Sequence, residues 1–282
     1  MVDLHSHTDC SDGVLPPDHL VDLARLGGLQ ALAITDHDTI EGYDLAEGYA
    51  RELGFDLICG VELSTKFHDR SIHILGYFLE KPPDAAFRSH LSCLQQARRE
   101  RNIRLAGRLR RLGLSITLEE AEKLGRSQTG RPHFAQLLVK KGYVANMREA
   151  FDRYLDESAA GFVERKDASL DNVLSWIREA GGLSSWAHPG RFLREAALPV
   201  EQLFAELASH GLNAIEVFHT DHFPEEAEAF RKFAQGLGLG ITGGSDFHGG
   251  ERSRAQLGSL KLPASLLEEL RELSHRTAAG NA

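Results

Sequence analysis

The sequence predicts an α/β fold in which seven strands form a closed or nearly closed barrel. Short apolar runs alternate with helix-like segments along the 282-residue chain, a pattern that favours parallel strands joined by helices. The runs are continuously apolar, as expected for parallel strands that are buried on both faces. Histidine and acidic residues lie at or just past the ends of these runs, where barrel enzymes hold their catalytic groups. An open, doubly wound sheet would collect such residues at one switch point instead.

The expected strands and helices follow one another in order along the chain. The seven apolar runs that predict strands span residues 2–4, 31–34, 56–58, 72–77, 183–186, 214–218 and 239–241. The helix-like segments between them include residues 18–26, 45–53, 170–180, 201–209 and 225–237. No internal repeat and no low-complexity segment is visible in the sequence.

One segment, residues 86–165, shows helical patterns and no convincing strand. Thr117 followed by Glu120 fits a capping box at the start of a helix, and Pro132 suits the first turn of a helix that reaches Leu138. We therefore expect a helical insertion between the fourth and fifth strands. The expected domains are residues 1–90 for the first part of the barrel, 91–165 for an insertion that caps the substrate site, and 166–282 for the second part of the barrel.

The composition is that of an ordinary globular protein, with 42% hydrophobic and 26% charged residues. The formal net charge of -9 excludes broad attraction to nucleic acid or to an anionic membrane, so an anionic substrate requires a local positive group. Three cysteines do not make a disulfide framework, which favours a reducing compartment. No secretory signal and no membrane-spanning run is visible. We expect a cytoplasmic protein with no membrane association and no obligate protein partner.

Nine histidine and acidic residues at the predicted strand ends form a candidate metal site. They occur in the segments H-S-H-T-D-C-S-D-G, T-D-H-D, G-V-E-L-S, I-H-I-L-G, A-H-P-G and S-D-F-H, and they are His5, His7, Asp12, His37, Glu62, His73, His188, Asp246 and His248. Imidazole and carboxylate ligands suit divalent zinc, manganese or iron. Because a catalytic zinc uses about three protein ligands, this larger set indicates a polynuclear hydrolytic site. A lone buried histidine is usually a core residue, but that explanation does not account for so many at strand ends.

In order along the chain, these motifs resemble the PHP (polymerase and histidinol phosphatase) family of the amidohydrolase superfamily. The resemblance covers the core of the chain and implies a distorted (β/α)7 barrel and a metal-dependent phosphoesterase. It also implies three divalent metal ions, with Mn²⁺ preferred over Fe²⁺ or Zn²⁺. The implied ligands are His5, His7, Glu62 and Asp246 for one ion, Glu62, His73 and His188 for the second, and Asp12, His37 and His248 for the third.

The insertion resembles the branch of this family that includes 3′,5′-nucleotide bisphosphate phosphatases and 5′-to-3′ exoribonucleases. The segment R-P-H-F-A at 131–135 resembles that branch's R-x-H-F-A segment, which implies that Arg131 and His133 bind phosphate during catalysis. The segment I-E-V at 215–217, followed by His222, resembles its I-E-V segment with a histidine after the sixth strand. This implies a catalytic, substrate-binding role for His222, with His219 as a rival.

Arginines offer further candidate contacts to phosphate, because a guanidinium group gives planar, bidentate hydrogen bonds to phosphate oxygens. Arg191 follows the A-H-P-G segment and is a candidate substrate-binding residue. A second group is a run of seven, namely Arg98, Arg99, Arg101, Arg104, Arg108, Arg110 and Arg111. This run is either a positive rim that guides a nucleotide or an RNA 5′ end, or a solvated helix face. The solvated face is the favoured interpretation, because charge runs usually lie in solvent.

The function that these observations predict is the hydrolysis of a phosphate monoester. The resemblance of the insertion favours the 3′-phosphate of nucleoside 3′,5′-bisphosphates, with degradation of short RNA from its 5′ end as an extension. The expected partner is therefore a small nucleotide or a short RNA. Three alternatives stay open: a histidinol-phosphate-type phosphatase, a phosphodiesterase that accepts cyclic phosphates, and a non-catalytic metal-binding module.

Overall fold

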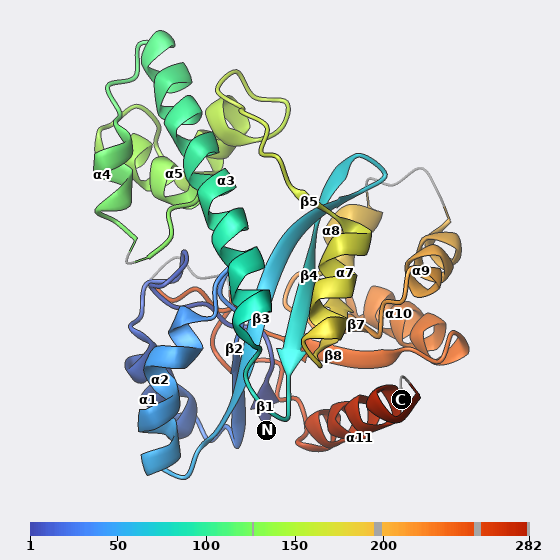
Figure 1. The fold of residues 1–282 in the computed structure, drawn as a ribbon. Helices are drawn as coiled ribbons and strands as arrows, with labels where there is room; N and C mark the ends of the chain where they lie inside the picture. The colour runs from blue at the N-terminus through green and yellow to red at the C-terminus, as the bar shows by residue number, and fades with distance from the viewer. Residues whose placement is uncertain (126, 195–198, 251–254, 281–282) are drawn as a thin grey trace.

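The computed structural model describes residues 1–125, 127–194, 199–250 and 255–280, and its centre is a sheet that curls into a nearly closed barrel (Figure 1). The hydrogen-bonded order is β1-β2-β3-β4-β6-β7-β8, and a short β5 pairs with β3 outside this path. The strands are β1 (Val2–Asp3), β2 (Ala31–Ile34), β3 (Asp56–Phe67), β4 (Arg70–Phe78), β5 (Ala168–Ser169), β6 (Leu183–Trp186), β7 (Ala214–His219) and β8 (Gly240–Gly244). The first and last strands meet where Leu4 N donates to Gly243 O at 3.2 Å. The predicted α/β barrel is confirmed.

The direction of β4 differs from the sequence expectation. We expected parallel strands with every candidate ligand at a carboxyl end, but β4 is antiparallel to both β3 and β6. A two-residue turn at His68 and Asp69, with φ of 47° and 59°, joins β3 directly to β4. His73 consequently lies near the beginning of its strand, and Glu62 lies in the middle of the long β3. The reversed direction nevertheless brings the beginning of β4 to the rim where the parallel strands end.

Helices cover the outside of the barrel. They are α1 (Pro17–Leu26), α2 (Glu41–Glu52), α7 (Leu170–Glu179), α8 (Pro189–Leu193), α9 (Val200–Ser209), α10 (Pro224–Gly236) and α11 (Ser265–Gly280). Figure 1 shows α1 and α2 on one side of the sheet, α7, α9 and α10 on the other, and α11 near the N-terminus. Leu266 and Leu270 of α11 pack with Val2, Leu4 and Tyr77 in one buried cluster. In the described ranges we find no helix with the length and apolar character of a membrane span.

The segment between β4 and β5 is helical, as predicted. It contains α3 (Ala85–Arg111), α4 (Leu118–Glu122), α5 (Arg131–Lys140), α6 (Met147–Ala150) and the π-helix η1 (Phe151–Leu155). The predicted capping box of Thr117 and Glu120 is present at the start of α4, and Pro132 lies in the first turn of α5. Both helix starts are therefore set by local side-chain chemistry.

Helix α3 joins the barrel to a second group of helices, which we call the cap and define as residues 98–155. The first turns of α3 bury Phe87, Leu91 and Leu94 in the main core of the barrel. Its last turns bury Leu105 and Leu109 in a separate cluster with residues of α4, α5 and η1. Figure 1 shows α4 and α5 beside the far part of α3. The cap thus has a hydrophobic core of its own, while the predicted domain limits at residues 91 and 165 stay a prediction.

Candidate metal centre

The nine predicted ligand side chains lie together at the rim of the barrel. Eight of them fall into groups whose ligand atoms all lie within 4.8 Å of one another, and His188 contacts the same cluster through Glu62. The groups are, first, His5, His7, Glu62 and Asp246; second, His37, Glu62 and His73; third, His7, Asp12, His37 and His248; and a further group of His5, Glu216 and His219. Six separate strands or strand-end loops supply the nine predicted ligands, and β7 adds Glu216 and His219.

The first group lies deepest. The Nε2 atoms of His5 and His7 approach Glu62 Oε2 at 3.4 and 3.2 Å, and both approach Asp246 Oδ1 at 3.4 and 3.3 Å. Both imidazole side chains are fully buried, and neither Nε2 atom has a hydrogen-bond partner among the described residues. Buried polar atoms are normally satisfied, so these four side chains fit a bound cation.

Glu62 connects this group to the second. Its Oε1 lies 2.7 Å from His73 Nδ1 and 2.9 Å from His188 Nε2, while its Oε2 lies 3.1 Å from His37 Nδ1. A buried carboxylate that faces imidazoles with both oxygens has the geometry of a bridging ligand. The backbone of His188 is left-handed, with a φ of 33°. Non-glycine residues rarely adopt this conformation and are enriched at functional sites.

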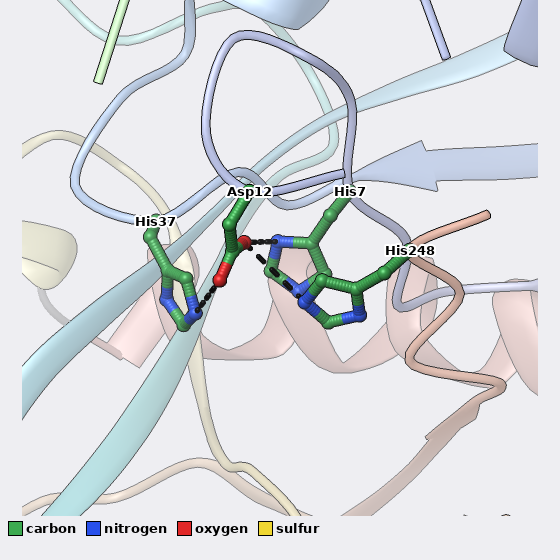
Figure 2. Close-up of side chains that lie close together, drawn as sticks. All are labelled: His7, Asp12, His37 and His248. Atoms are coloured by element: carbon green, nitrogen blue, oxygen red, sulfur yellow. Dashed lines mark ion pairs between the residues drawn. The ribbon is translucent and has the colours of Figure 1, made fainter. Parts of the chain in front are cut away.

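The third group is drawn in Figure 2. Asp12 lies between its partners, with Oδ1 3.3 Å from His248 Nε2 and 3.9 Å from His7 Nδ1, and with Oδ2 3.7 Å from His37 Nε2. The structure thus adds His7 to the implied ligands of this group. These separations exceed normal hydrogen bonds, which leaves room for an ion between the side chains.

Close backbone packing brings the last strand of the barrel, β8, against the segment that follows the first strand, β1. A Cβ atom added to Gly244 at the end of β8 would lie 2.3 Å from the Cβ of His5. Only glycine therefore allows β8 to lie against the strand that leads to His5. Asp246 follows two residues later in a left-handed conformation with a φ of 55°, which turns its carboxylate toward His5 and His7.

Glu216 is a buried residue of the site that the sequence interpretation did not assign. His5 Nδ1 lies 2.9 Å from Glu216 Oε1, and the backbone N–H of His188 donates to Glu216 Oε2 at 2.7 Å. One carboxylate therefore orients two candidate ligands from behind, as is common around metal-binding histidines. The available signal was an acidic residue in the middle of the apolar strand β7.

Burial and neighbouring charges set the protonation of the site. Burial lowers the pKa of His37 to about 3 and that of His188 to about 4, so both imidazoles are neutral and free to bind a metal. Burial alone would raise the pKa of the Asp12, Glu62 and Asp246 carboxyl groups, but neighbouring histidines hold all three well below their usual range. The site therefore presents ionised carboxylates at neutral pH.

A cavity of about 290 Å³ opens directly onto these ligands and is lined on its other side by the cap. Arg131 and Arg191, both predicted to bind substrate, line this cavity together with His37, Glu62 and His248. Arg191 donates through Nε to Asp221 at 2.7 Å and through Nη2 to Asp246 at 3.2 Å. These contacts hold its guanidinium group at the edge of the candidate metal centre.

His133 and His222 lie outside the set of cavity-lining residues. Gly130 N donates to His133 Nδ1 at 3.0 Å, which closes the start of α5. The ring of His222 is held by backbone, with Nδ1 2.8 Å from Val217 O and Nε2 accepting from Gly190 N at 3.2 Å. The predicted substrate contacts of these two histidines stay predictions.

His219, the rival of His222, points into the site instead. Its Nδ1 accepts from Asp221 N at 3.0 Å, so its Nε2 bears the proton in the neutral ring. That Nε2 is buried, has no hydrogen-bond partner among the described residues, and lies 3.4 Å from Asp246 Oδ2. The hydrogen bonds therefore favour His219 over His222 as a group that faces the reacting centre.

Comparison with known proteins places this arrangement in context. A 5′-3′ exoribonuclease of Haemophilus influenzae is 34% identical over 248 residues, which covers 87% of this chain and 89% of the relative. A 3′,5′-nucleoside bisphosphate phosphatase of Chromobacterium violaceum is 33% identical over 278 residues, which covers 98% and 97% of the two chains. The crystal structure of a protein from Bifidobacterium adolescentis, assigned as a metal-dependent phosphoesterase, superposes with a TM-score of 0.86 at 31% identity and covers 96% of each chain.

The family comparison agrees with the fold and with the site. The model of the PHP domain matches residues 3–164, which run from the second residue of β1 through β4 and the whole cap. Six of the nine candidate ligands, from His5 to His73, lie inside the matched segment, and His188, Asp246 and His248 lie beyond it. The relatives extend the similarity over those remaining residues. The chain belongs to the PHP domain family.

Proposed function

We propose that the protein removes the 3′-phosphate of nucleoside 3′,5′-bisphosphates and also degrades short RNA from its 5′ end. The reaction class, hydrolysis of a phosphoester bond by a metal-dependent enzyme, is that of the family and of the relatives. The single observation that supports the finer proposal is the position of the cap. It covers a metal-ligand cluster with arginines, in a chain that aligns with a nucleoside bisphosphate phosphatase over nearly its full length.

We further propose that the cluster holds three divalent ions, with Mn²⁺ as the preferred metal and Fe²⁺ or Zn²⁺ as alternatives. The residues fit such ions, because buried ring nitrogens of His5, His7 and His37 lack hydrogen-bond partners in the described structure and face ionised carboxylates. When bound, such ions supply Lewis-acid stabilisation of phosphoryl charge and activate a water molecule for attack.

The chain's own residues have separate tasks in this proposal. Glu62, Asp12 and Asp246 present the negative charge that retains the ions, and Glu216 holds the His5 ring in its orientation. Arg131 and Arg191 line the cavity, where their guanidinium groups can orient the phosphate and neutralise its oxygens. The buried His219 Nε2–H lies beside Asp246 and is a candidate hydrogen-bond donor to the departing sugar oxygen.

Phosphate release from a small panel of substrates tests the proposal. The panel contains adenosine 3′,5′-bisphosphate, AMP, a 5′-phosphorylated RNA trimer and histidinol phosphate, each with Mn²⁺-loaded protein. We expect preference for the bisphosphate, and removal of single nucleotides from the trimer. A preference for histidinol phosphate would overturn the substrate assignment. Turnover that survives complete chelation of metal would overturn the reaction class.

A further inference from the structure

Four arginines surround the part of the cavity that lies under the cap. Arg98 and Arg101 come from α3, Arg131 begins α5, and Arg165 follows η1; all four line the cavity together with candidate metal ligands. The sequence interpretation favoured a solvated face for the arginine run of α3. That interpretation holds for the five exposed members, Arg99, Arg104, Arg108, Arg110 and Arg111. It is wrong for Arg98 and Arg101, because the packing of the cap against the barrel turns these two toward the cavity.

Two of the four arginines are held by carboxylates. Arg98 donates to Asp38 Oδ2 through Nε at 3.1 Å and through Nη2 at 2.5 Å, and Arg165 donates to the same oxygen at 2.7 Å. Arg165 also pairs with Asp167. The Asp38 side chain is fully buried, so these pairs fix both guanidinium groups at defined places in the cavity wall.

Arg101 lacks a carboxylate partner. It is only 5% exposed, its Nε donates to Asn102 Oδ1 at 3.0 Å, and no acidic oxygen in the described structure lies within ion-pair distance of it. Asp167, the acid that acts on it most strongly, is already paired with Arg165. Burial first, and then the charges of Arg98, Arg131 and Arg165, hold the pKa of Arg101 well below its usual value.

A buried and unpaired guanidinium is costly for a protein to maintain. Arginines are, however, the preferred side chains for binding phosphate through planar, bidentate hydrogen bonds. A dianionic phosphate placed among these side chains would supply the missing counter-charge to Arg101. A cluster that is unfavourable without a ligand and favourable with one has the properties of a binding site.

We propose that Arg101, positioned beside Arg98 and Arg165, binds the second phosphate of the substrate, the one that is not hydrolysed. This inference rests on the proposed function, in which the 3′-phosphate lies at the metal centre and the 5′-phosphate therefore lies under the cap. In 5′-phosphorylated RNA, the same placement puts the first internucleotide linkage at the metal centre. One arginine pocket would thus serve both the bisphosphate and the RNA end.

Binding of AMP to the metal-free protein, measured by isothermal titration calorimetry, tests the pocket without catalysis. Because the titration uses metal-free protein, no bound ion contributes to AMP binding, and the comparison of variants reports on the arginines. Loss of a hydrogen bond to a charged group predicts that Arg101→Gln weakens AMP binding by roughly 10- to 100-fold. The control Arg110→Gln removes an exposed arginine from the same helix and should leave the affinity unchanged. Equal affinity in wild type and Arg101→Gln would overturn the proposal.

Two further measurements separate binding from a structural role. Because Arg101→Gln removes an uncompensated charge, the ligand-free variant should be at least as stable to urea as the wild type. A clear loss of stability would indicate a structural role instead. In the Mn²⁺-loaded enzyme, the ratio of kcat/KM for adenosine 3′,5′-bisphosphate to that for adenosine 3′-monophosphate should fall by roughly 10- to 100-fold. An equal fall for both substrates would contradict the pocket. If the wild type hydrolyses neither, the proposed function fails and the AMP titration alone decides the pocket.

Discussion

Replacement of Asp38 by Asn should destabilise the protein strongly, although Asp38 is not among the candidate metal ligands. Its carboxylate accepts from Arg98 and Arg165 and also from the backbone N–H of Ser64 at 3.3 Å. It therefore ties α3 of the cap, and the segment that leaves the cap, to the barrel loop that contains His37. An amide of the same size keeps the packing and removes the charge.

The expected magnitude follows from the burial of the pair. Asp38 is fully buried, and the side chains of Arg98 and Arg165 are 11% and 8% exposed. In Asp38→Asn, Arg165 keeps Asp167, but Arg98 keeps no carboxylate partner among the described residues. Removing one member of a buried ion pair typically costs about 3–5 kcal/mol. That is a large share of the roughly 5–15 kcal/mol that stabilises an ordinary domain.

Urea unfolding followed by circular dichroism at neutral pH measures this change. The matched control is Asp44→Asn, which breaks a bidentate pair with Arg88 at 2.5 and 2.9 Å on the surface. Both of those side chains are more than a third exposed, so the control should lose about 1 kcal/mol at most. If the two variants lost the same small amount of stability, the argument from burial would be refuted.

Three other changes test the site. Glu216→Gln should weaken metal affinity by roughly 10- to 100-fold while the fold is kept, because the substitution loosens the orientation of His5 and of the His188 backbone. Metal titration measures this change, and an unchanged affinity would show that Glu216 does not orient the ligands. Asp12→Ala should abolish phosphate release and lower the bound metal found by elemental analysis, with an unchanged circular dichroism spectrum; full metal content would contradict its assignment as a ligand. Arg131→Ala should mainly raise KM for multiply phosphorylated substrates, and unaltered kinetics would exclude its phosphate contact.

The barrel and the candidate ligands could be predicted from the sequence because each depends on a short stretch of neighbouring residues. Short apolar runs mark strands, and ligands such as His5 and His37 stand directly at the ends of those runs. The antiparallel direction of β4 could not be predicted, since an apolar strand has the same composition in either direction. Tight two-residue hairpins usually contain Asn-Gly or Asp-Gly, whereas this turn is His68-Asp69. Its residues adopt the required left-handed backbone without the sequence pattern that predicts it.

The residues that sequence interpretation missed depend on contacts between distant segments. In the sequence, Arg101 does not differ from the other arginines of its helix. Only the packing of the cap against the barrel places it at the cavity. Asp38 meets Arg98 and Arg165 from positions 60 and 127 residues away in the chain. Pairings of this kind have no periodicity, so they are visible only in three dimensions.

The reversed strand also determines how the cap is built. Because β4 runs away from the metal centre, it ends at Phe78 on the opposite side of the barrel. Helix α3 must then return along the whole barrel, and its 27 residues span about 40 Å. Deleting one residue near Leu94 would turn the far half of the helix by about 100° and point Arg98 and Arg101 away from the cavity. Adding seven residues would nearly restore the rotation but raise the cap by about 10 Å. The number of residues in α3 therefore sets both the direction in which the cap arginines point and the distance of the cap from the metal centre.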